Sequence, residues 1–356
     1  MDGGAEEWTL YVKRYYKRYR SFILEIETIR KHIVIRNLFI VMGEGHMWTV
    51  IVAIVSVIAV LMLVLITASI YLYNVGILRN NKDFMNADPN LIKATHPWEY
   101  ANDWLQTQPM ETVHIRSDDG LQLAGYYVPS LTDSNKVVIL AHGYSGQGRD
   151  MSNFAKMYQD LGYHVLMPDD RGHGQSEGHY IGFGWHDRKD YLKWIDYIIK
   201  SQGEDSQIIL HGISMGGSTV LMTSGEPLPD QVKCIVSDCA YTSVKDILSY
   251  QLKTMYKLPA FPLIPLTSLI CRMKAGYFFG EASAVTQVSR TKLPILFIHG
   301  DEDKFVPYDM VHRLYEAAGS EKELLSVPNA QHGNAYFADK EGYGNKLTSF
   351  VGRYVF

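Results

Sequence analysis

The stretch HGISMGGST, residues 211–219, joins an apolar run typical of a strand to a segment that is expected to form a helix. Its centre, Gly212-Ile213-Ser214-Met215-Gly216, has the pattern G-x-S-x-G. A sharp turn from strand to helix needs residues without bulk on both sides, and such a turn holds its central side chain exposed and strained. The same pattern also occurs in ordinary glycine-rich connections, so other parts of the chain must show whether Ser214 is a nucleophile.

The composition is typical of a mildly acidic globular protein. The chain has 356 residues, 47% of them hydrophobic, and a formal charge of −4, which suits one large domain or two small ones. A nucleic-acid partner is not expected, because such a partner requires a basic face. The three cysteines, Cys234, Cys239 and Cys271, form neither a disulfide framework nor a metal-ligand pair.

An apolar segment near the N-terminus predicts one transmembrane anchor. Residues 48–73 contain 26 residues without a charge, and Trp48, Tyr71 and Tyr73 lie where interfacial aromatic residues are common. The apolar region of a secretory signal peptide is shorter, about 7–15 residues, so an uncleaved anchor is expected. Residues 74–110 are polar and are expected to form a linker.

Residues 1–46 form an N-terminal extension that bears on the orientation of the anchor. They carry eight Lys and Arg residues and six Asp and Glu residues, which would place the N-terminus in the cytoplasm and the large domain outside. Just before Met47 the chain reads GEGH, and its Gly-Glu-Gly part back-translates to a purine-rich stretch that resembles a bacterial ribosome-binding site. We therefore also hypothesise that translation starts at Met47, which N-terminal sequencing of the natural protein would refute by finding Asp2 or Gly3. The anchor would then be flanked only by Arg79 and Lys82, too few charges to set its orientation.

From residue 111 onward, strands alternate with segments of helical length. The runs TVHIRS and LQLAGYYVP, separated by DDG, predict an antiparallel hairpin. Short apolar runs that are typical of strands buried on both faces follow at residues 136–142, 164–169, 207–212, 234–238 and 294–300. Helices are expected between them at residues 149–161, 187–202, 214–225 and 307–319. This order predicts an α/β fold with a mostly parallel sheet flanked by helices.

Residues 241–290 interrupt this alternation. They are rich in Leu, Met, Phe, Tyr and Pro, and are far longer than an ordinary connection. They could add one more layer to the core, but an insertion of this length in a compact domain is more often functional. We therefore expect them to form a short helical lid, with an apolar wall over the site.

Two further strand ends supply partners for a serine nucleophile. Asp301, Glu302 and Asp303 follow one buried strand in FIHGDEDKFVP, and His332 follows the next in LSVPNAQHGN. The order serine, acid, histidine is that of α/β-hydrolases, and the carboxyl ends of parallel strands meet at one edge of a sheet.

Residues 111–356 resemble the α/β-hydrolase superfamily, most closely the membrane-anchored bacterial hydrolases of the serine aminopeptidase and lysophospholipase-like group. The resemblance is carried by LAHGYSG, PDDRGHGQSEG, HGISMGG, FIHGDEDKFVP and AQHG. It implies Ser214 as nucleophile, His332 as general base and Asp303 as the acid that orients the imidazole. Asp301 and Asp238, also at strand ends, remain alternatives for the acid.

An oxyanion hole needs two backbone donors. One is expected from Met215, which follows the nucleophile, and the other from Tyr144 in AHGYSG. His142, His211 and His299 each precede a glycine at a strand end and are expected to bond to loop backbone, while His173 belongs to a structural loop held by Arg171. No cofactor motif and no metal-ligand spacing is found in the sequence, so neither is expected.

These features together predict a membrane-anchored serine hydrolase that cleaves carboxylic esters through an acyl-enzyme. Its expected partners are the membrane and a small-molecule acyl ester or lipid-like substrate. An aminopeptidase is one alternative, although residues 241–290 hold only Asp246 and Glu281 as acids, against six basic residues, which disfavours a cationic substrate terminus. A non-catalytic cell-surface binding module on the same fold is the other.

Overall fold

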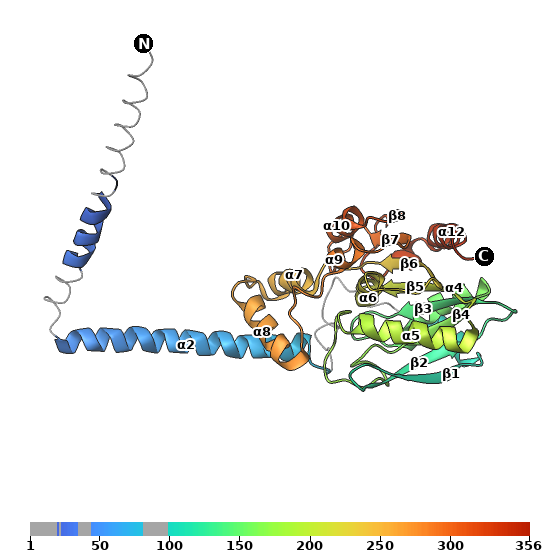
Figure 1. The fold of residues 1–356 in the computed structure, drawn as a ribbon, viewed down its shortest axis with the longest axis horizontal. Helices are drawn as coiled ribbons and strands as arrows, with labels where there is room; N and C mark the ends of the chain where they lie inside the picture. Colours follow the sequence, from blue (N-terminus) through green and yellow to red (C-terminus); the bar gives the residue numbers. More distant parts are fainter. Residues whose placement is uncertain (1–19, 21–22, 35–43, 81–98) are drawn as a thin grey trace, which may run out of the picture. The chain divides into compact units, whose positions relative to one another are not determined.

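The computed structural model describes residues 20, 23–34, 44–80 and 99–356 (Figure 1). Most of the N-terminal extension and the middle of the expected linker lie outside the described residues. The chain divides into two compact units, residues 1–65 and residues 66–356.

Helix α2 (Glu44–Gly76) contains the apolar segment. Its part His46–Gly76 has 31 residues and a mean hydropathy of 3.3 over its most apolar window, none of which is buried. The helix is therefore long and apolar enough to cross a membrane. Its last residues, from Ile66 onward, belong to the second unit.

The second unit is built on one eight-stranded sheet with the order β1-β2-β4-β3-β5-β6-β7-β8. β1 and β2 form the predicted antiparallel hairpin, β2 is also antiparallel to β4, and the pairs from β4 through β3 to β8 are parallel. The predicted α/β-hydrolase fold is thus confirmed. The strands are β1 (Glu111–Arg116), β2 (Gln122–Val128), β3 (Lys136–Ala141), β4 (His164–Pro168), β5 (Gln207–Ile213), β6 (Val232–Asp238), β7 (Ile295–Gly300) and β8 (Lys322–Val327).

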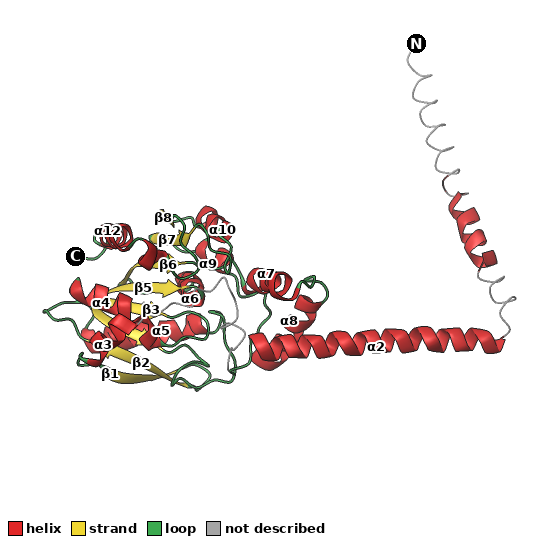
Figure 2. Cartoon of the chain, turned by 180° about the vertical axis from the view of Figure 1, so that it is seen from behind, coloured by secondary structure: helices red, strands yellow, loops and turns green. Residues whose placement is uncertain are grey.

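Helices cover both faces of this sheet (Figures 1 and 2), which explains why its central strands are almost wholly apolar. One face shares a hydrophobic core with α3 (Glu99–Gln106), α4 (Ser152–Asp160) and α12 (Lys340–Val351). Alternate strand residues such as Ile139 and Leu210 point the other way and are equally buried. That side is covered by α5 (Asp187–Gln202), α6 (Met215–Ser224) and α10 (Asp309–Ala317), while η2 (Gly148–Met151) and α11 (Ala335–Ala338) are single turns.

Residues 241–290, which the sequence predicts to form a lid and which are called the lid below, contain α7 (Val244–Tyr256), α8 (Leu263–Ala275) and α9 (Ala284–Val288). α7 and α8 contact each other, whereas α9 packs against α6 and α10. Parts of the expected linker also contact the domain. Ile77 is buried, and the Arg79 guanidinium donates hydrogen bonds to the carbonyl oxygens of Ser176 and Gly174, both at 2.7 Å.

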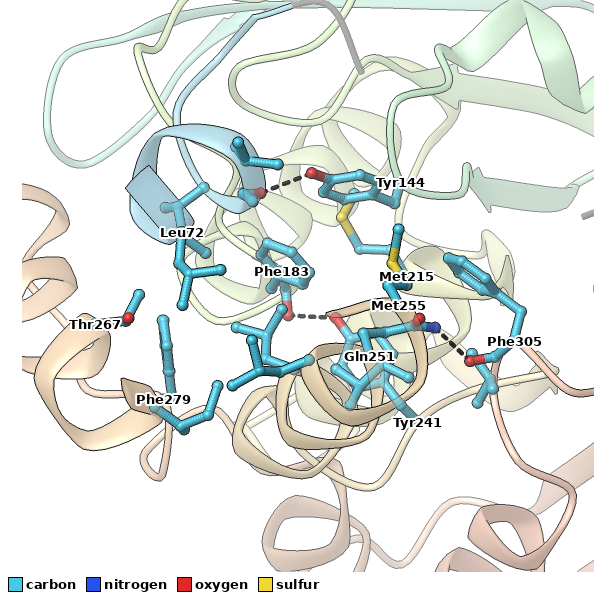
Figure 3. A pocket seen from close by; sticks show the side chains of 18 of the residues that line it. Leu72, Tyr144, Phe183, Met215, Tyr241, Gln251, Met255, Thr267, Phe279 and Phe305 are labelled. Carbon is cyan, nitrogen blue, oxygen red and sulfur yellow. Dashed lines mark hydrogen bonds between the residues drawn. The ribbon is translucent and has the colours of Figure 1, made fainter. Parts of the chain in front are cut away.

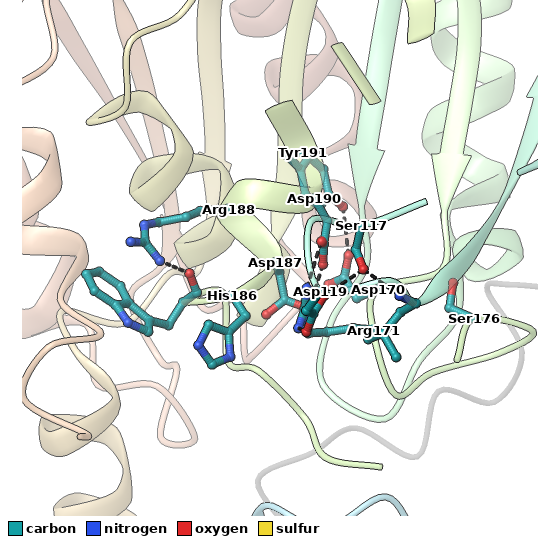
Figure 4. A network of polar contacts seen from close by, with 12 residues as sticks. Ser117, Asp119, Asp170, Arg171, Ser176, His186, Asp187, Arg188, Asp190 and Tyr191 are labelled. Atoms are coloured by element: carbon teal, nitrogen blue, oxygen red, sulfur yellow. Dashed lines mark hydrogen bonds and ion pairs between the residues drawn. The ribbon is translucent and has the colours of Figure 1, made fainter. Parts of the chain in front are cut away.

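A buried charge network joins the loop after β4 to α5 (Figure 4). The Arg171 guanidinium forms two hydrogen bonds with Asp190, at 2.7 and 2.8 Å, and two with Asp119. Asp190 lies in the first turn of α5, and Arg171 is its partner there. Mainly because of burial, the pKa values of Asp187 and Asp190 are raised to about 7, and that of Asp170 to about 8.

Asp170→Asn is expected to make the thermal stability of the domain less dependent on pH. Because the pKa of Asp170 is raised in the folded state, the folded protein keeps a proton that the unfolded chain releases between about pH 4 and pH 8. Wild-type stability should fall through this window by up to about 1.4 kcal/mol per pH unit for this group. An asparagine does not titrate, so the gain in melting temperature over wild type should grow from pH 5 to pH 9.

The control for this prediction is Asp118→Asn. Asp118 forms an exposed ion pair with Lys193 in the same region. Thermal unfolding of both variants and wild type at pH 5, 7 and 9 is the measurement. An unchanged pH slope for Asp170→Asn would show that Asp170 is not the group that binds the proton.

Candidate active site

Ser214 lies at a strained turn between β5 and α6. Its backbone has φ 57° and ψ −114°, a conformation that residues other than glycine rarely adopt. The Ser214 N–H donates to the carbonyl oxygen of Asp238 at 2.8 Å, which ties the turn to the end of β6. The side chain is thereby held above the carboxyl edge of the sheet, at the position of the nucleophile in α/β-hydrolases.

The two glycines of the motif are required by close backbone contacts. A Cβ atom on Gly212 would lie 2.1 Å from the carbonyl oxygen of Gly216, and one on Gly216 would lie 2.1 Å from that of Ala141. Both distances are far below any allowed contact, so a side chain at either position would force the backbones apart. The G-x-S-x-G pattern therefore has a physical cause here, and is not an ordinary glycine-rich connection.

His332 lies within hydrogen-bond distance of both Ser214 and Asp303. Its Nε2 atom is 2.8 Å from Ser214 Oγ, and its Nδ1 atom is 2.7 Å from Asp303 Oδ2. The residue comes from the loop that follows β8, and its ring packs against Phe305 at a centroid distance of 4.9 Å. The structure thus brings together the three side chains that the sequence places at three separate strand ends.

The Asp303 carboxylate is buried and fully bonded. Its Oδ1 atom accepts hydrogen bonds from the N–H groups of Phe305 and Val306, and His299 Nε2 lies 3.2 Å from its Oδ2 atom. Burial alone would raise the pKa of Asp303, but the charge of His332 and the hydrogen bonds from His299 and His332 hold it well below its usual range. The carboxylate therefore stays ionised next to His332.

The contact of His299 with Asp303 was not expected from the sequence. His299 does bond to loop backbone, as predicted, with Nε2 2.9 Å from the carbonyl oxygen of Val306. The same atom also faces the carboxylate, because His299 lies at the end of β7 and Asp303 follows this strand four positions later in the chain. The separation of four residues between His299 and Asp303 was the feature of the sequence that could have predicted this contact.

The two alternative acids have other partners. Asp301 Oδ1 accepts from the N–H of Asn329 at 2.6 Å in an exposed turn. Asp238 is buried, and its Oδ2 atom accepts from the Tyr343 hydroxyl at 3.1 Å. Burial raises the pKa of Asp238 to about 6. Among the three candidates, the structure places only Asp303 in hydrogen-bond contact with His332.

The residues expected to supply the oxyanion donors lie beside Ser214. Met215 is the first residue of α6, and the N–H groups of the first helical turn have no acceptor within the helix. The loop with Tyr144 runs alongside, since a Cβ atom on Gly143 would be 3.7 Å from Ser214 Cβ. Ser214, Met215 and Tyr144 line the same pocket.

This pocket is apolar, and it is lined by Ser214 and by residues of the lid. Figure 3 shows Tyr144, Met215 and the lid residue Met255 around it. Its empty volume is about 890 Å³, part of which is open to solvent. Among the described residues that line it, none carries a charged side chain. Its polar groups are largely occupied: Tyr241 donates to the carbonyl oxygen of Phe183 at 2.9 Å, and Gln251 donates to that of Phe305 at 2.7 Å. Such a pocket suits an aliphatic or aromatic group.

One group of atoms near the site has the composition of a metal site. The Cys239 sulfur, an Asp303 oxygen and a His332 nitrogen lie within 4.8 Å of one another. Burial raises the pKa of the Cys239 thiol well above its usual value, so the thiol stays protonated and is a poor ligand. Cys234 and Cys239 are both free and buried.

The remaining histidines have mostly structural contacts. His142 Nδ1 is 2.7 Å from the carbonyl oxygen of Gly143, and His173 Nδ1 is 3.1 Å from that of Arg171, as expected. The expectation for His211 was wrong, because its ring nitrogens face the hydroxyls of Tyr158 and Tyr343 in the core. Its strand is central and packed on that face, so no loop backbone is within reach.

Comparison with protein families agrees with this geometry. The family model described as serine aminopeptidase, S33, matches residues 132–262 and 243–336, which together make up more than half of the chain. The chain belongs to this family. The S33 family is part of the α/β-hydrolase superfamily, so the chain is an α/β-hydrolase.

Several proteins resemble this S33 family member over most of their length. The uncharacterized protein YqkD of Bacillus subtilis is 29% identical over 237 residues, which cover 67% of this chain and 77% of that protein. A thermostable monoacylglycerol lipase of a Bacillus species is 27% identical over 227 residues, covering 55% of this chain and 82% of the lipase. An uncharacterized membrane protein of Saccharomyces cerevisiae is 23% identical and covers 68% of this chain and 80% of its own.

Solved structures show the same architecture. An esterase of Pyrococcus furiosus superimposes with a TM-score of 0.58 at 22% identity, covering 75% of this chain and 97% of the esterase. The acylaminoacyl peptidase of Pyrococcus horikoshii gives a TM-score of 0.53 at 18% identity and covers 73% of this chain, but only 44% of its own. At these identities the likeness shows the fold. Together with the family, these findings support hydrolase activity.

Proposed function

We propose that this chain is a membrane-anchored serine hydrolase that cleaves carboxylic esters through an acyl-enzyme. The observation that carries the proposal is the continuous hydrogen-bonded series Ser214 Oγ, His332 Nε2, His332 Nδ1 and Asp303 Oδ2, with contacts of 2.8 and 2.7 Å. In such a series the imidazole removes the serine proton, and the carboxylate stabilises the imidazolium that results.

The reaction would proceed in two halves at these atoms. Ser214 Oγ attacks the ester carbonyl carbon while its proton moves to His332 Nε2, and His332 then protonates the departing alcohol oxygen. Water attacks the acyl-serine in the second half, with His332 again taking and returning a proton, and the carboxylic acid leaves. The backbone N–H groups of Met215 and Tyr144 would donate to the oxyanion that forms in each half.

An ester substrate is supported over a peptide with a free amino terminus by the uncharged pocket. Recognition of an ammonium group calls for a carboxylate in the site. The two acids of the lid are engaged elsewhere: Asp246 pairs with Arg313 at 3.0 Å, and Glu281 accepts from the Phe278 N–H at 2.8 Å. Neither is among the residues that line the pocket.

A non-catalytic binding module is the less favoured reading, because of the strain at Ser214. A residue other than glycine in a strained backbone conformation costs free energy, on the order of 1–3 kcal/mol, without any benefit to simple binding. That cost is typical of a site that presents a nucleophile.

A panel of substrates tests the proposed reaction. We expect faster turnover of p-nitrophenyl esters than of aminoacyl p-nitroanilides, and we expect a fluorophosphonate probe to label one peptide, which mass spectrometry would identify as the one containing Ser214. Activity confined to the anilides would replace the esterase by a peptidase. Absence of labelling in the folded protein would favour the binding module.

Membrane anchoring is supported by the length and hydropathy of α2. With residues 1–46 in the cytoplasm, the hydrolase domain would lie on the opposite side of the membrane. Protease added to right-side-out vesicles should then digest the domain, whereas full protection would reverse this orientation.

A further inference from the structure

We propose that the last turns of α2 form one wall of the acyl pocket, and that the pocket takes the aliphatic chain of a lipid ester that enters from the bilayer. This inference rests on the proposed esterase function. The inference goes beyond that function by assigning substrate selection to the helix that anchors the protein.

The end of α2 reaches the same pocket as the nucleophile. Leu72, Val75 and Gly76 line the pocket together with Ser214, and so does Ile77, which follows the helix. Figure 3 shows Leu72 at the pocket. They belong to the same compact unit as the hydrolase domain.

One face of the helix end is buried against the domain. Ser69, Tyr73 and Ile77, spaced four residues apart, have exposed fractions of 0, 2 and 1%. This spacing places them on one side of a helix, whereas Ile70 on another side is 40% exposed. The contact is therefore a continuous stripe, and it fixes which residues of α2 face the pocket.

Tyr144 connects this helix end to the expected oxyanion loop. Its hydroxyl donates a hydrogen bond of 2.7 Å to the carbonyl oxygen of Gly76 (Figure 3). Carbonyl groups in the last turn of a helix lack partners within the helix, so this bond also caps α2. A residue whose N–H group is assigned to the oxyanion thus touches the anchor through its side chain.

The lid supplies the opposite wall. Met255, Ile264 and Phe279 line the pocket from the lid. α8 contacts the end of α2, since Lys274 Nζ in α8 is 5.5 Å from the centre of the Tyr73 ring. The pocket is thus bounded by a helix of membrane-spanning length on one side and by the lid on the other.

Exposed apolar side chains of the lid indicate from where the acyl chain of the substrate would enter. We call them the outer lid patch and define it as Leu258, Phe261, Leu269, Met273 and Phe278. Phe261 is 78% exposed and Met273 is 70% exposed, which is unusual for large apolar side chains close together in sequence. Basic residues interleave with this patch: Lys257, Arg272 and Lys274. Apolar side chains mixed with basic ones, next to a membrane-spanning helix, match the interfacial region of an anionic bilayer.

The pocket wall is tested by Val75→Trp in the full-length protein in detergent micelles. Each methylene kept out of an apolar site costs about a factor of four, so exclusion of three methylenes should lower kcat/KM for p-nitrophenyl decanoate by about 60-fold. Turnover of p-nitrophenyl acetate should fall by a clearly smaller factor, since a two-carbon acyl group has no long chain to lose, so the expected result is a lower ratio of decanoate to acetate turnover. The matched control is Ile70→Trp, the same change on the exposed side of the helix, which should leave the ratio of the two substrates unchanged.

The outcomes separate the two proposals. A wild-type protein that hydrolyses neither ester overturns the proposed function, and this inference with it. A wild-type protein that hydrolyses both, with a ratio unaltered by Val75→Trp, retains the esterase and overturns the wall formed by α2.

A second arm tests entry from the bilayer. The double variant Phe261→Ser, Met273→Ser is reconstituted in vesicles of phosphatidylcholine and phosphatidylglycerol that contain 4-methylumbelliferyl palmitate. Its turnover of this lipid should fall about 15-fold, the effect of losing roughly two methylenes of membrane contact. Its turnover of dissolved p-nitrophenyl acetate should not change. Leu131→Ser, in the exposed loop between β2 and β3, is the control. An undiminished rate on the palmitate would mean that the chain enters from water.

Discussion

Ser214→Ala is expected to lower kcat for ester hydrolysis by about a million-fold, close to the loss seen when a whole serine triad is removed. The reason is the contact of 2.8 Å between Ser214 Oγ and His332 Nε2, which leaves no other atom in place to take up the acyl group. Stability should change little, because the backbone N–H of Ser214, which bonds to Asp238, is retained. Turnover of p-nitrophenyl acetate and labelling by a fluorophosphonate are the measurements.

The matched control is Ser249→Ala in α7. The Ser249 hydroxyl donates to the carbonyl oxygen of Lys245 within the helix and does not line the pocket. This variant should keep the wild-type rate and labelling. If Ser214→Ala retained more than about one hundredth of the wild-type rate in a folded protein, its role as nucleophile would be untenable.

Asp303→Asn is expected to lower kcat by about ten thousand-fold while Ser214 and His332 stay in place. The N–H group of an amide at this position can donate a hydrogen bond to His332 Nδ1, which favours the tautomer that carries its proton on Nε2 and so cannot accept the serine proton there. The substitution also removes the charge that stabilises the imidazolium. Because the pKa of Asp303 is held below its usual range, the carboxylate should stay ionised and keep its contribution to stability at any pH above about 4. Its contribution to stability should be lost only as the pH falls through its lowered folded-state pKa.

Asp238→Asn is the matched control for Asp303→Asn. Asp238 is also a buried carboxyl at a strand end, but it bonds to Tyr343 and not to His332. We expect less than a tenfold change in kcat for this variant, measured on the same ester. A larger loss in Asp238→Asn than in Asp303→Asn would assign the acid to Asp238, the alternative that the sequence left open.

The sheet could be predicted because its signal is local. Strands buried on both faces must be short and apolar, and β3 to β7 begin and end within about two residues of their predicted limits. The order of Ser214, the acid and His332 also follows from sequence, since parallel strands deliver their ends to one edge. The choice of Asp303 over Asp238 and Asp301 came from a resemblance, because spacing alone allows all three.

The contacts that were not predicted depend on segments far apart in the chain. A run of apolar residues in α2 indicates a membrane span, and nothing in the run reveals that Leu72 and Val75 also line a pocket. The position of α9 within the lid could not be predicted for a similar reason. Its sequence is as apolar as that of α7, and only the packing in the structure shows that α9 lies on α6 and α10. His211 was assigned to backbone because it precedes a glycine, and its two tyrosine partners come from α4 and α12.

Gly212 and Gly216 have no Cβ atom, and this feature has an evolutionary consequence. With backbone oxygens 2.1 Å from where each Cβ would be, neither position can accept another residue without moving the nucleophile. New substrate preferences cannot arise there by gradual change. Changes in substrate preference must instead arise in segments that accept substitutions, which are the lid and helix α2.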